Sequence, residues 1–464
     1  MQNLKVVDCF DSVPFSVVSE KLRADKNAPL LAIDALTPCI YIGSESKIFA
    51  ISEEKLKNKL SIEEVNLAAE SGGTIVSMEY LSDQMLLAVM FNNGAIVSYS
   101  RFDSRSISTT ESVALLPDEI SAASWSPDLE LCVVASGSSL ALVNNEFLTV
   151  DTVPLHPEGQ GRDQPTTVGW GKKETQFQGT AGKHAAFEKP EDPTDIHPWD
   201  TGETVITWRG DGQYFAVSAV DVKNQRVVRT FSREGDHCST CDAVAGLEPQ
   251  LDWKPSGALI TGSAHASDGK HKILFFERNG LKHGNFQLPH EVYTNRVRKL
   301  QWNADSTVLA IWLQGIESHI SELQLWMVEN YYWYLKQSWI FVNPDKLAQF
   351  IWDPAASTVL YVLLCSGKYR RYQLALQIDR AAVCRSAPVA VIDGRNLQVT
   401  RLGRTTIPPP MAELTFQNAD FILQTVLSED GRYCVAVLKD EFRIFDFDIR
   451  RWQPSSLFAL GPAK

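Results

Sequence analysis

The sequence has no apolar segment long enough to cross a bilayer. Its longest apolar runs include residues 132–135 and 359–365, whereas a membrane helix needs about 18–20 apolar residues. The first residues show no basic region followed by an apolar core, and the 8 cysteines are scattered along 464 residues. The sequence therefore predicts a reduced, intracellular protein without a signal peptide. We expect it in the cytoplasm, with a nuclear pool as an alternative, and we expect no membrane partner.

Positive charge is also scarce. Lys and Arg number 44 against 56 Asp and Glu, which gives a net charge of −12 at pH 7. This balance argues against a chain whose main role is to bind nucleic-acid phosphates, and it leaves room only for local basic patches. The composition, 22% charged and 44% hydrophobic, excludes collagen-like and wholly disordered classes and indicates a globular protein.

Catalytic and metal-binding motifs are missing as well. The sequence contains no nucleophile elbow, zinc-protease helix motif, phosphate-binding loop or dinucleotide fingerprint. A single Cys-x-x-Cys lies at residues 238–241 without a second pair, which favours a turn between strands over a metal or redox site. We therefore expect no enzyme activity, no catalytic residue, no metal and no cofactor.

What the sequence does contain is a repeat in which a large aromatic residue precedes turn-forming residues and a short β-rich run. The clearest copies begin at Trp125, Trp208, Trp253, Trp302 and Trp352. With Trp170 and two weaker copies, the anchors fall at positions 35, 80, 125, 170, 208, 253, 302 and 352, which are 38 to 50 residues apart. Repeats of about 40–50 residues with about four short strands are typical of β-propeller blades.

The residue types explain the repeat. Pro, Asp, Ser and Gly favour tight turns, and the preceding tryptophan supplies a large side chain that can pack between adjacent sheets. We therefore interpret the anchor tryptophans as packing residues rather than as a surface that stacks on a ligand. The fold prediction is an all-β propeller with seven blades, and eight blades remain the alternative because there are eight anchors.

Two breaks in the repeat predict loops or boundaries. Residues 183–203 contain acidic residues and prolines, and their latter half predicts a surface loop between blades. Three prolines at 408–410 predict a segment between domains. The predicted domains are therefore residues 1–405, a first propeller, and residues 406–464, the start of a second. Residues 421–447 resemble one further blade, which cannot close a ring. We expect an incomplete second propeller with exposed strand edges and protease sensitivity after about residue 405.

The stretch around Trp170 differs from the other repeats. It contains more glycine and charge than the core of a blade needs, and two glycines flank the tryptophan, which indicates a sharp turn or a close approach to another molecule. A protein-binding surface is our interpretation, and a tight blade turn is the alternative. The candidate protein-binding residues are Gly169, Trp170, Gly171, Lys172, Lys173, Glu174, Gln176 and Phe177.

A second candidate is basic. Lys368, Arg370 and Arg371 alternate with Tyr369 and Tyr372, a composition that can contact RNA phosphates and stack on bases. The alternative is an ordinary strand whose alternate residues face solvent.

The motif at residues 168–187 resembles the family of the largest subunit of the eukaryotic Elongator complex. Further motifs with the same resemblance follow in the same order, at residues 207–218, 253–257, 300–306, 333–338, 391–394 and 408–411. The resemblance runs from the N-terminus into the predicted second propeller.

The resemblance implies a non-catalytic scaffold with two N-terminal WD-repeat propellers. It further implies, as partners, a catalytic radical-SAM and acetyltransferase-like subunit and a second WD-repeat propeller subunit, in a complex that modifies wobble uridines of tRNA. No residue of this chain matches the family's basic tRNA-binding segment, so we expect tRNA contact only indirectly, through the complex. The family's dimerisation region has no counterpart in the sequence either. The competing hypotheses are a propeller scaffold in another assembly, such as a transport coat, and an enzyme that uses the central channel.

Overall fold

The computed structural model describes residues 2–453 except for 25–27, 35–36, 38, 46, 55–58, 66–71, 104–105, 164–193, 266–269, 292–294, 317–319, 382–384 and 448–450. Within these residues the regular elements are β-strands, together with one nine-residue helix, α1 (Ser16–Ala24). No helix in this part of the chain is long and apolar enough to span a membrane. The all-β prediction is confirmed.

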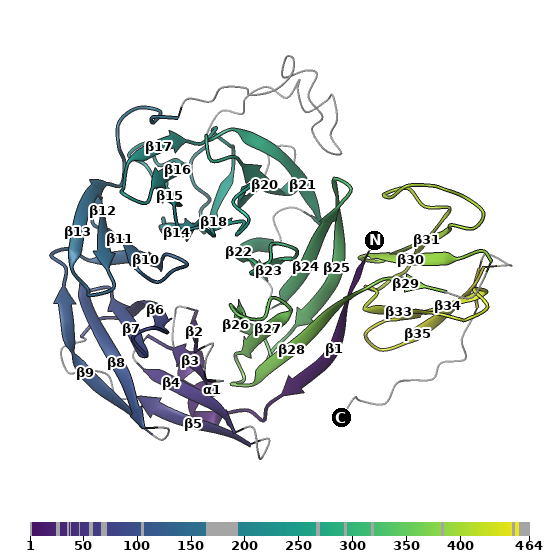
Figure 1. The fold of residues 1–464 in the computed structure, drawn as a ribbon, viewed down its shortest axis with the longest axis horizontal. Coiled ribbons are helices and arrows are strands. Elements are labelled where there is room, and N and C mark those ends of the chain that lie inside the picture. The colour runs from purple at the N-terminus through teal and green to yellow at the C-terminus, as the bar shows by residue number, and fades with distance from the viewer. Residues whose placement is uncertain are drawn as a thin grey trace.

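Strands β1 to β28 form four-stranded antiparallel sheets that stand around a central axis (Figure 1). The first three sheets in chain order are β2 (Leu30–Asp34), β3 (Cys39–Gly43), β4 (Ile48–Glu54) and β5 (Lys59–Val65); β6 (Ile75–Leu81), β7 (Leu86–Phe91), β8 (Ala95–Asp103) and β9 (Ser106–Leu115); and β10 (Ile120–Trp125), β11 (Leu131–Ser136), β12 (Ser139–Asn144) and β13 (Thr149–Pro154).

The next three sheets are β14 (Val205–Trp208), β15 (Tyr214–Val220), β16 (Arg226–Ser232) and β17 (His237–Thr240); β18 (Leu247–Trp253), β19 (Ile260–His265), β20 (Lys270–Phe276) and β21 (Lys282–Glu291); and β22 (Asn295–Trp302), β23 (Leu309–Gly315), β24 (Ser321–Glu329) and β25 (Tyr332–Phe341). The seventh sheet of the ring combines β26 (Leu347–Trp352), β27 (Val359–Leu364) and β28 (Tyr369–Gln377) with the N-terminal strand β1 (Asn3–Asp11).

The anchor tryptophans pack between sheets, as predicted. Trp208, Trp302 and Trp352 end the first strands of their sheets and are buried. Each indole N–H donates a hydrogen bond to the preceding sheet, as Trp208 does to the carbonyl of Ser124 at 3.0 Å and Trp352 to the carbonyl of Gln301 at 3.2 Å. The anchor at position 170 lies outside the described residues, so seven sheets of the ring are described where the sequence has eight anchors.

The turns after four of the anchor tryptophans share one backbone conformation. Leu129, Gly212, Gly257 and Ser306 each stand four residues after an anchor tryptophan and have φ values of 58°, 67°, 85° and 66°. Their N–H groups close the turn, as that of Gly212 does on the carbonyl of Arg209 at 2.8 Å. Glycine adopts this left-handed backbone without strain, which explains its recurrence in these turns, whereas Leu129 and Ser306 adopt it despite their side chains.

Apolar side chains fill the space between neighbouring sheets. A separate cluster lies at each junction around the ring. The junction between the first and seventh sheets holds two clusters, one of which also includes Val18 of α1. The sheets are therefore covered on both faces, which is how a propeller solves the problem that one small sheet cannot bury both of its own faces.

The ring closes through its N-terminus. Strand β1 pairs antiparallel with β28, so residues from the two ends of the ring complete one sheet. The N-terminus therefore lies beside the C-terminal part of the chain, at the edge of the ring (Figure 1).

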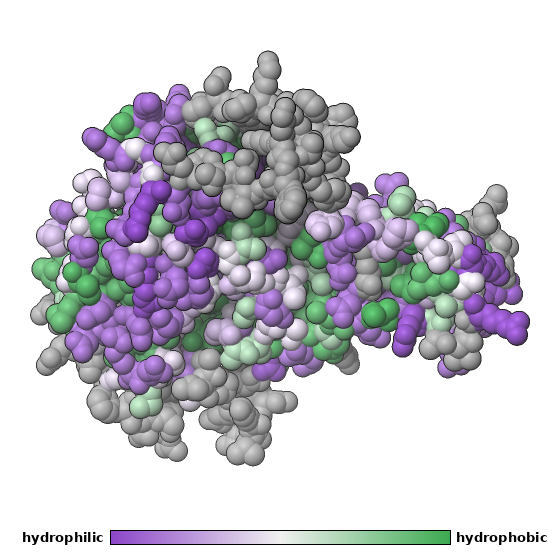
Figure 2. Space-filling model, turned by 45° about the horizontal axis from the view of Figure 1, so that its top comes forward, coloured by the Kyte–Doolittle hydropathy of each residue, from purple (hydrophilic) through white to green (hydrophobic). Residues whose placement is uncertain are grey.

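Two further four-stranded sheets follow. They are β29 (Asp379–Arg380), β30 (Pro388–Asp393), β31 (Asn396–Arg401) and β32 (Leu414–Gln417), and β33 (Gln424–Leu427), β34 (Tyr433–Val437), β35 (Phe442–Asp446) and β36 (Arg451–Gln453). This two-sheet group projects from the side of the ring (Figure 2). The expected domain boundary after residue 405 lies between β31 and β32, which pair in one sheet. By strand pairing, the change from ring to two-sheet group comes earlier, between Gln377 and Asp379.

Candidate functional site

The predicted protein-binding stretch cannot be placed. Gly169, Trp170, Gly171, Lys172, Lys173, Glu174, Gln176 and Phe177 all lie outside the described residues. Its role stays a prediction.

The predicted basic patch is largely neutralised by neighbouring side chains. Lys368 pairs with Asp345 at 2.7 Å and Arg370 with Asp11 at 3.0 Å, while the Arg371 guanidinium lies 5.9 Å from the ring centre of Phe10. All three basic side chains are half-buried. Two of these partners belong to β1, so the patch also helps to hold the closing strand.

The Cys-x-x-Cys motif is buried. The thiols of Cys238 and Cys241 are free, and burial raises the pKa of both. A raised pKa keeps a thiol protonated and unreactive at neutral pH, so the pair has the character of structural cysteines.

Charged residues on the inner strands connect neighbouring sheets. Asp252 accepts a hydrogen bond from the backbone N–H of Trp302 at 2.6 Å, and the Lys299 ammonium donates to the carbonyl of Phe350 at 2.7 Å. Burial raises the pKa of Asp252 to about 7 and lowers that of Lys299 to about 8. Because both groups are bonded to the backbone of the next sheet, their geometry favours a structural role over catalysis.

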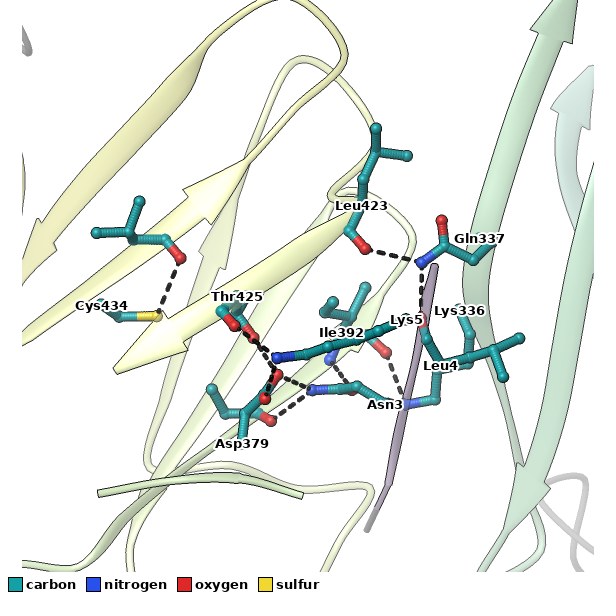
Figure 3. A network of polar contacts seen from close by, with 12 residues as sticks. Asn3, Leu4, Lys5, Lys336, Gln337, Asp379, Ile392, Leu423, Thr425 and Cys434 are labelled. Atoms are coloured by element: carbon teal, nitrogen blue, oxygen red, sulfur yellow. Dashed lines mark hydrogen bonds and ion pairs between the residues drawn. The ribbon is translucent and has the colours of Figure 1, made fainter. Parts of the chain in front are cut away.

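The most elaborate polar site lies where the ring meets the two-sheet group (Figure 3). We call it the seam and define it by Asn3, Lys5, Lys336, Gln337, Asp379, Asp393 and Thr425. Two of the sequence motifs noted above meet here, because residues 333–338 lie in β25 and residues 391–394 lie at the end of β30. Leu335 and Gly394 join them through a backbone hydrogen bond of 2.7 Å.

Asn3 is the centre of the seam. Its side-chain amide N–H groups donate to Asp379 and to the carbonyl of Ala390, both at 2.9 Å, and its amide oxygen accepts from the backbone N–H of Ile392 at 2.9 Å. The same oxygen accepts from the Lys336 ammonium at 3.3 Å. A buried asparagine with its polar atoms bonded fixes the orientation of the groups around it.

Lys5 and Asp379 form a buried ion pair. The Lys5 ammonium lies 2.6 Å from an Asp379 carboxylate oxygen, and the two side chains are 6% and 3% exposed. Lys5 also donates to the carbonyl of Thr425 at 3.0 Å, and the Thr425 hydroxyl donates to Asp379. The pair thus connects β1 of the ring with the first strand of each sheet in the two-sheet group.

Strand β25 provides the other half of the seam. Lys336 donates to the carbonyl of Ile392 at 2.9 Å, and Gln337 donates to the carbonyls of Leu4 and Leu423 at 2.6 and 2.7 Å. Burial lowers the pKa of Lys336 to about 8, although the negative charge of Asp393 acts in the opposite direction and raises it. Burial also raises the pKa of Asp393, although it accepts hydrogen bonds from the Leu335 N–H and the Tyr332 hydroxyl.

A cleft of about 630 Å³ opens beside the seam. Its wall is aromatic, with Phe286 and Trp333 stacked at 4.6 Å between ring centres, and Arg395 stands over the ring of Phe421 at 4.9 Å. The ring and the two-sheet group both line the cleft, so its shape depends on how the seam holds them.

The sequence alone did not identify the seam. Asn3, Lys5 and Asp379 are isolated polar residues in strand-forming segments, and only closure of the ring brings residue 3 within hydrogen-bond distance of residue 379. The usable signal was the pair of motifs at 333–338 and 391–394, which the structure brings together.

The chain matches two family models. One, described as ELP1 first N-terminal beta-propeller, matches residues 1–355, and the other, ELP1 N-terminal second beta-propeller, matches residues 391–457. The second match begins within β30, in agreement with a change of unit before residue 405.

Curated proteins give the same result. The chain is 38% identical over 387 residues to Elongator complex protein 1 of Mus musculus, an alignment that covers 80% of this chain and 29% of the mouse protein. It is 32% identical over 390 residues to the Drosophila melanogaster protein of that name, covering 82% and 30% of the two chains. The chain therefore spans less than a third of the length of these relatives. Among solved structures, a chain of the "Crystal Structure of Mitotic Checkpoint Complex" is similar over 80% of this chain and 93% of its own length, at 14% identity and a TM-score of 0.49.

Proposed function

The chain belongs to the Elongator complex protein 1 family, and from this premise we propose that it is a non-catalytic scaffold subunit of the Elongator complex. In this role it holds the catalytic radical-SAM and acetyltransferase-like subunit and a second WD-repeat propeller subunit. It thereby supports modification of wobble uridines in tRNA, which it contacts only through the complex. We place it in the cytoplasm, with a nuclear pool as the alternative.

The observation that carries this proposal is the match of both family models, to residues 1–355 and 391–457. The seam supports a scaffold role on physical grounds. Its buried ion pair and the hydrogen bonds of Asn3 and Gln337 join ring and two-sheet group. Two propeller units held in a fixed relation can present docking surfaces at a defined spacing, which lowers the ordering cost of binding partners.

An affinity pull-down of the 464-residue chain from extract of its own cells, at gentle salt, tests the proposal. Quantitative mass spectrometry should identify the radical-SAM subunit and the second propeller subunit in larger amounts than in a pull-down with the tag alone. Circular dichroism verifies that the chain used as bait is folded. If a folded chain recovers neither subunit, a scaffold role for this part of the family protein is refuted. Crosslinks confined to transport-coat proteins would favour the alternative assembly.

A seam variant adds a structural test. Asp379→Ala should reduce recovery of partners that contact both units, because it removes the carboxylate that joins Lys5, Asn3 and Thr425. Asp236→Ala provides the matched control, because Asp236 forms an exposed ion pair with Arg162 far from the seam in sequence. Equal losses in both variants would speak against a role of the seam in assembly.

A further inference from the structure

The cleft beside the seam is bordered by both units of the molecule. Strands β21, β24 and β25 of the ring form one wall, and the β30–β31 turn, the end of β32 and Phe421 form the other. Its volume of about 630 Å³ lies within the roughly 300–1,000 Å³ of typical ligand pockets. The seam holds the two walls in place, and the cleft between them has the size of a binding site.

The ring wall of the cleft is aromatic. Trp333 stacks on Phe286 at 4.6 Å and on Phe275 at 5.1 Å between ring centres, and Phe286 packs against Trp326 at 4.7 Å. Phe286 and Trp326 are buried, whereas Trp333 is only partly buried. Rings that support one another in this way form a rigid apolar surface, so a ligand can pack on it at a low cost in entropy.

Carboxamide side chains surround this wall. Asn285 and Gln287 lie on β21, Asn396 begins β31 and Gln417 ends β32. Within the described residues, none of these side chains has a hydrogen-bond partner. A carboxamide offers both a donor and an acceptor, so it can bond to the N–H and C=O groups of a peptide backbone.

Strand β21 adds a free backbone edge. It is the last strand of its sheet, in the order β18-β19-β20-β21, and no described strand pairs with its outer side. An edge strand presents unpaired N–H and C=O groups, and extended peptides bind to such edges as an added strand. The cleft therefore offers hydrogen bonds for a backbone as well as an apolar surface for a side chain.

The two charged residues of the described lining differ in their partners. Asp393 accepts hydrogen bonds from the Leu335 N–H and the Tyr332 hydroxyl. Arg395 is exposed, stands over the ring of Phe421 at 4.9 Å and pairs with no carboxylate among the described residues. The charge that is free to bind a ligand is therefore positive, and it complements an acidic group.

We propose that the cleft binds an extended peptide segment of a partner protein, with a bulky apolar side chain against Trp333 and an acidic side chain against Arg395. The carboxamides and the edge of β21 bond to the peptide backbone. Because the cleft has walls from both units, the bound segment also joins the ring to the two-sheet group. The proposal goes beyond the scaffold function and does not depend on which assembly supplies the peptide.

The same surface is poorly suited to a nucleic acid. Among the described residues of the lining, Arg395 is the only cation, whereas binding to a nucleic-acid backbone depends on several phosphate contacts. The net charge of −12 acts against such contacts. RNA is therefore the alternative that the experiment has to exclude.

Fluorescence anisotropy of the 464-residue chain with labelled synthetic peptides tests the proposal. The peptides have a Gly-Ser background and carry one Trp, Leu or Phe and one Asp at varied spacing, and each has a twin with Lys in place of Asp. At least one Asp peptide should bind saturably, and its Lys twin should bind about ten-fold more weakly. Peptides without the apolar residue should show no measurable binding.

A charge-reversal variant locates the binding site. Arg395→Glu should reverse the preference, so that the Lys twin binds more tightly than the Asp peptide. Lys223→Glu is the matched control, because Lys223 is also exposed and lies in the turn between β15 and β16, as Arg395 lies in the turn between β30 and β31. This control should leave both affinities unchanged. A benzophenone derivative of the best peptide should crosslink to β21, β25 or the β30–β31 turn.

Absence of saturable binding by every peptide would overturn the proposal, as would crosslinks confined to other parts of the chain. Equal binding of Asp and Lys peptides to the unaltered chain would also overturn it, and this comparison does not require any variant to fold. If a labelled single-stranded RNA oligonucleotide binds instead and loses affinity in Arg395→Glu, the cleft belongs to a nucleic acid and the peptide proposal is wrong.

Discussion

The ring and the two-sheet group bury their sheets in different ways. In the ring, apolar clusters lie at each junction between neighbouring sheets, and closure through β1 leaves no described sheet with only one neighbour. The two-sheet group has one apolar cluster, which joins its two sheets and includes Leu397 and Phe445. Its contacts with the ring add the polar seam and the packing of Phe421 against the apolar cluster between the fifth and sixth sheets.

This difference indicates how each region is stabilised. A closed ring distributes stability over many similar apolar junctions, so no single junction decides the fold. The two-sheet group depends on one internal junction, on the packing of Phe421 against the ring and on a small number of buried polar contacts. We therefore expect mutations in the seam and in its one core to act locally and strongly, which the following predictions test.

The largest effect is expected for Asp379→Ala. The variant leaves the Lys5 ammonium buried without its carboxylate, and breaking a buried pair in this way costs about 3–5 kcal/mol. Hydrogen exchange should show faster exchange of amides in β29 to β36, with the ring strands β10 to β20 unchanged. Uniform acceleration in both regions would contradict the local role of the seam.

The second largest effect is expected when one buried leucine in each region is shortened to alanine. Leu397, in the core of the two-sheet group, and Leu309, in the ring, are both 0% exposed. Each change to alanine should cost about 2–4 kcal/mol. Limited proteolysis should cleave the two-sheet group of Leu397→Ala while the ring survives, whereas Leu309→Ala should resist cleavage because its sheet keeps both neighbours. The same fragment pattern from both variants would remove the distinction between the regions.

A smaller effect should follow from the pKa of Lys336. Burial lowers it to about 8, so protonation favours the unfolded state, where the pKa is about 10.4. The cost is fully present below pH 8 and is relieved as pH rises from about 8 toward 10.4. Between pH 7.5 and 9.5 the free energy of opening the seam should rise by on the order of 1–2 kcal/mol more in the unaltered chain than in Lys336→Met. Parallel pH profiles of hydrogen exchange in β30 for the two proteins would exclude this role.

The smallest effect is expected for Asp236→Ala. The Arg162–Asp236 pair at 2.6 Å is largely exposed, and such pairs contribute about 0.2–1 kcal/mol. Chemical unfolding should therefore scarcely distinguish this variant from the unaltered chain. A loss comparable with that of Asp379→Ala would mean that burial does not explain the strength of the seam.

Much of the fold was predictable because it repeats. Anchors such as Trp208, Trp302 and Trp352 mark the ends of first strands, and the turns after Trp208 and Trp302 contain a residue with a left-handed backbone, Gly212 and Ser306, which restricts the residues favoured there. The domain boundary was harder to predict. The three prolines at 408–410 indicated a break, but they lie in a connection within one sheet, between β31 and β32.

The sites were less predictable than the fold. The seam joins Asn3 and Asp379, and a buried polar cluster joins Glu248 to His265 and His271, 17 and 23 positions further on. Neither set forms a motif along the chain, because ring closure and strand register bring the members together. The sequence pointed instead to candidate residues that lie close together along the chain. Among these, the basic residues Lys368 and Arg370 pair with neighbouring carboxylates.

Closure through β1 also has a consequence for synthesis. Asn3 precedes its partner Asp379 by 376 residues, which a ribosome working at about 5–20 residues per second takes roughly 20–75 seconds to add. Throughout that time β1 has neither β28 nor the two-sheet group to pair with, and an unpaired strand edge can pair with other chains. Strand β1, which closes the ring in the folded molecule, is therefore the strand that must avoid pairing with other chains for the longest time during synthesis.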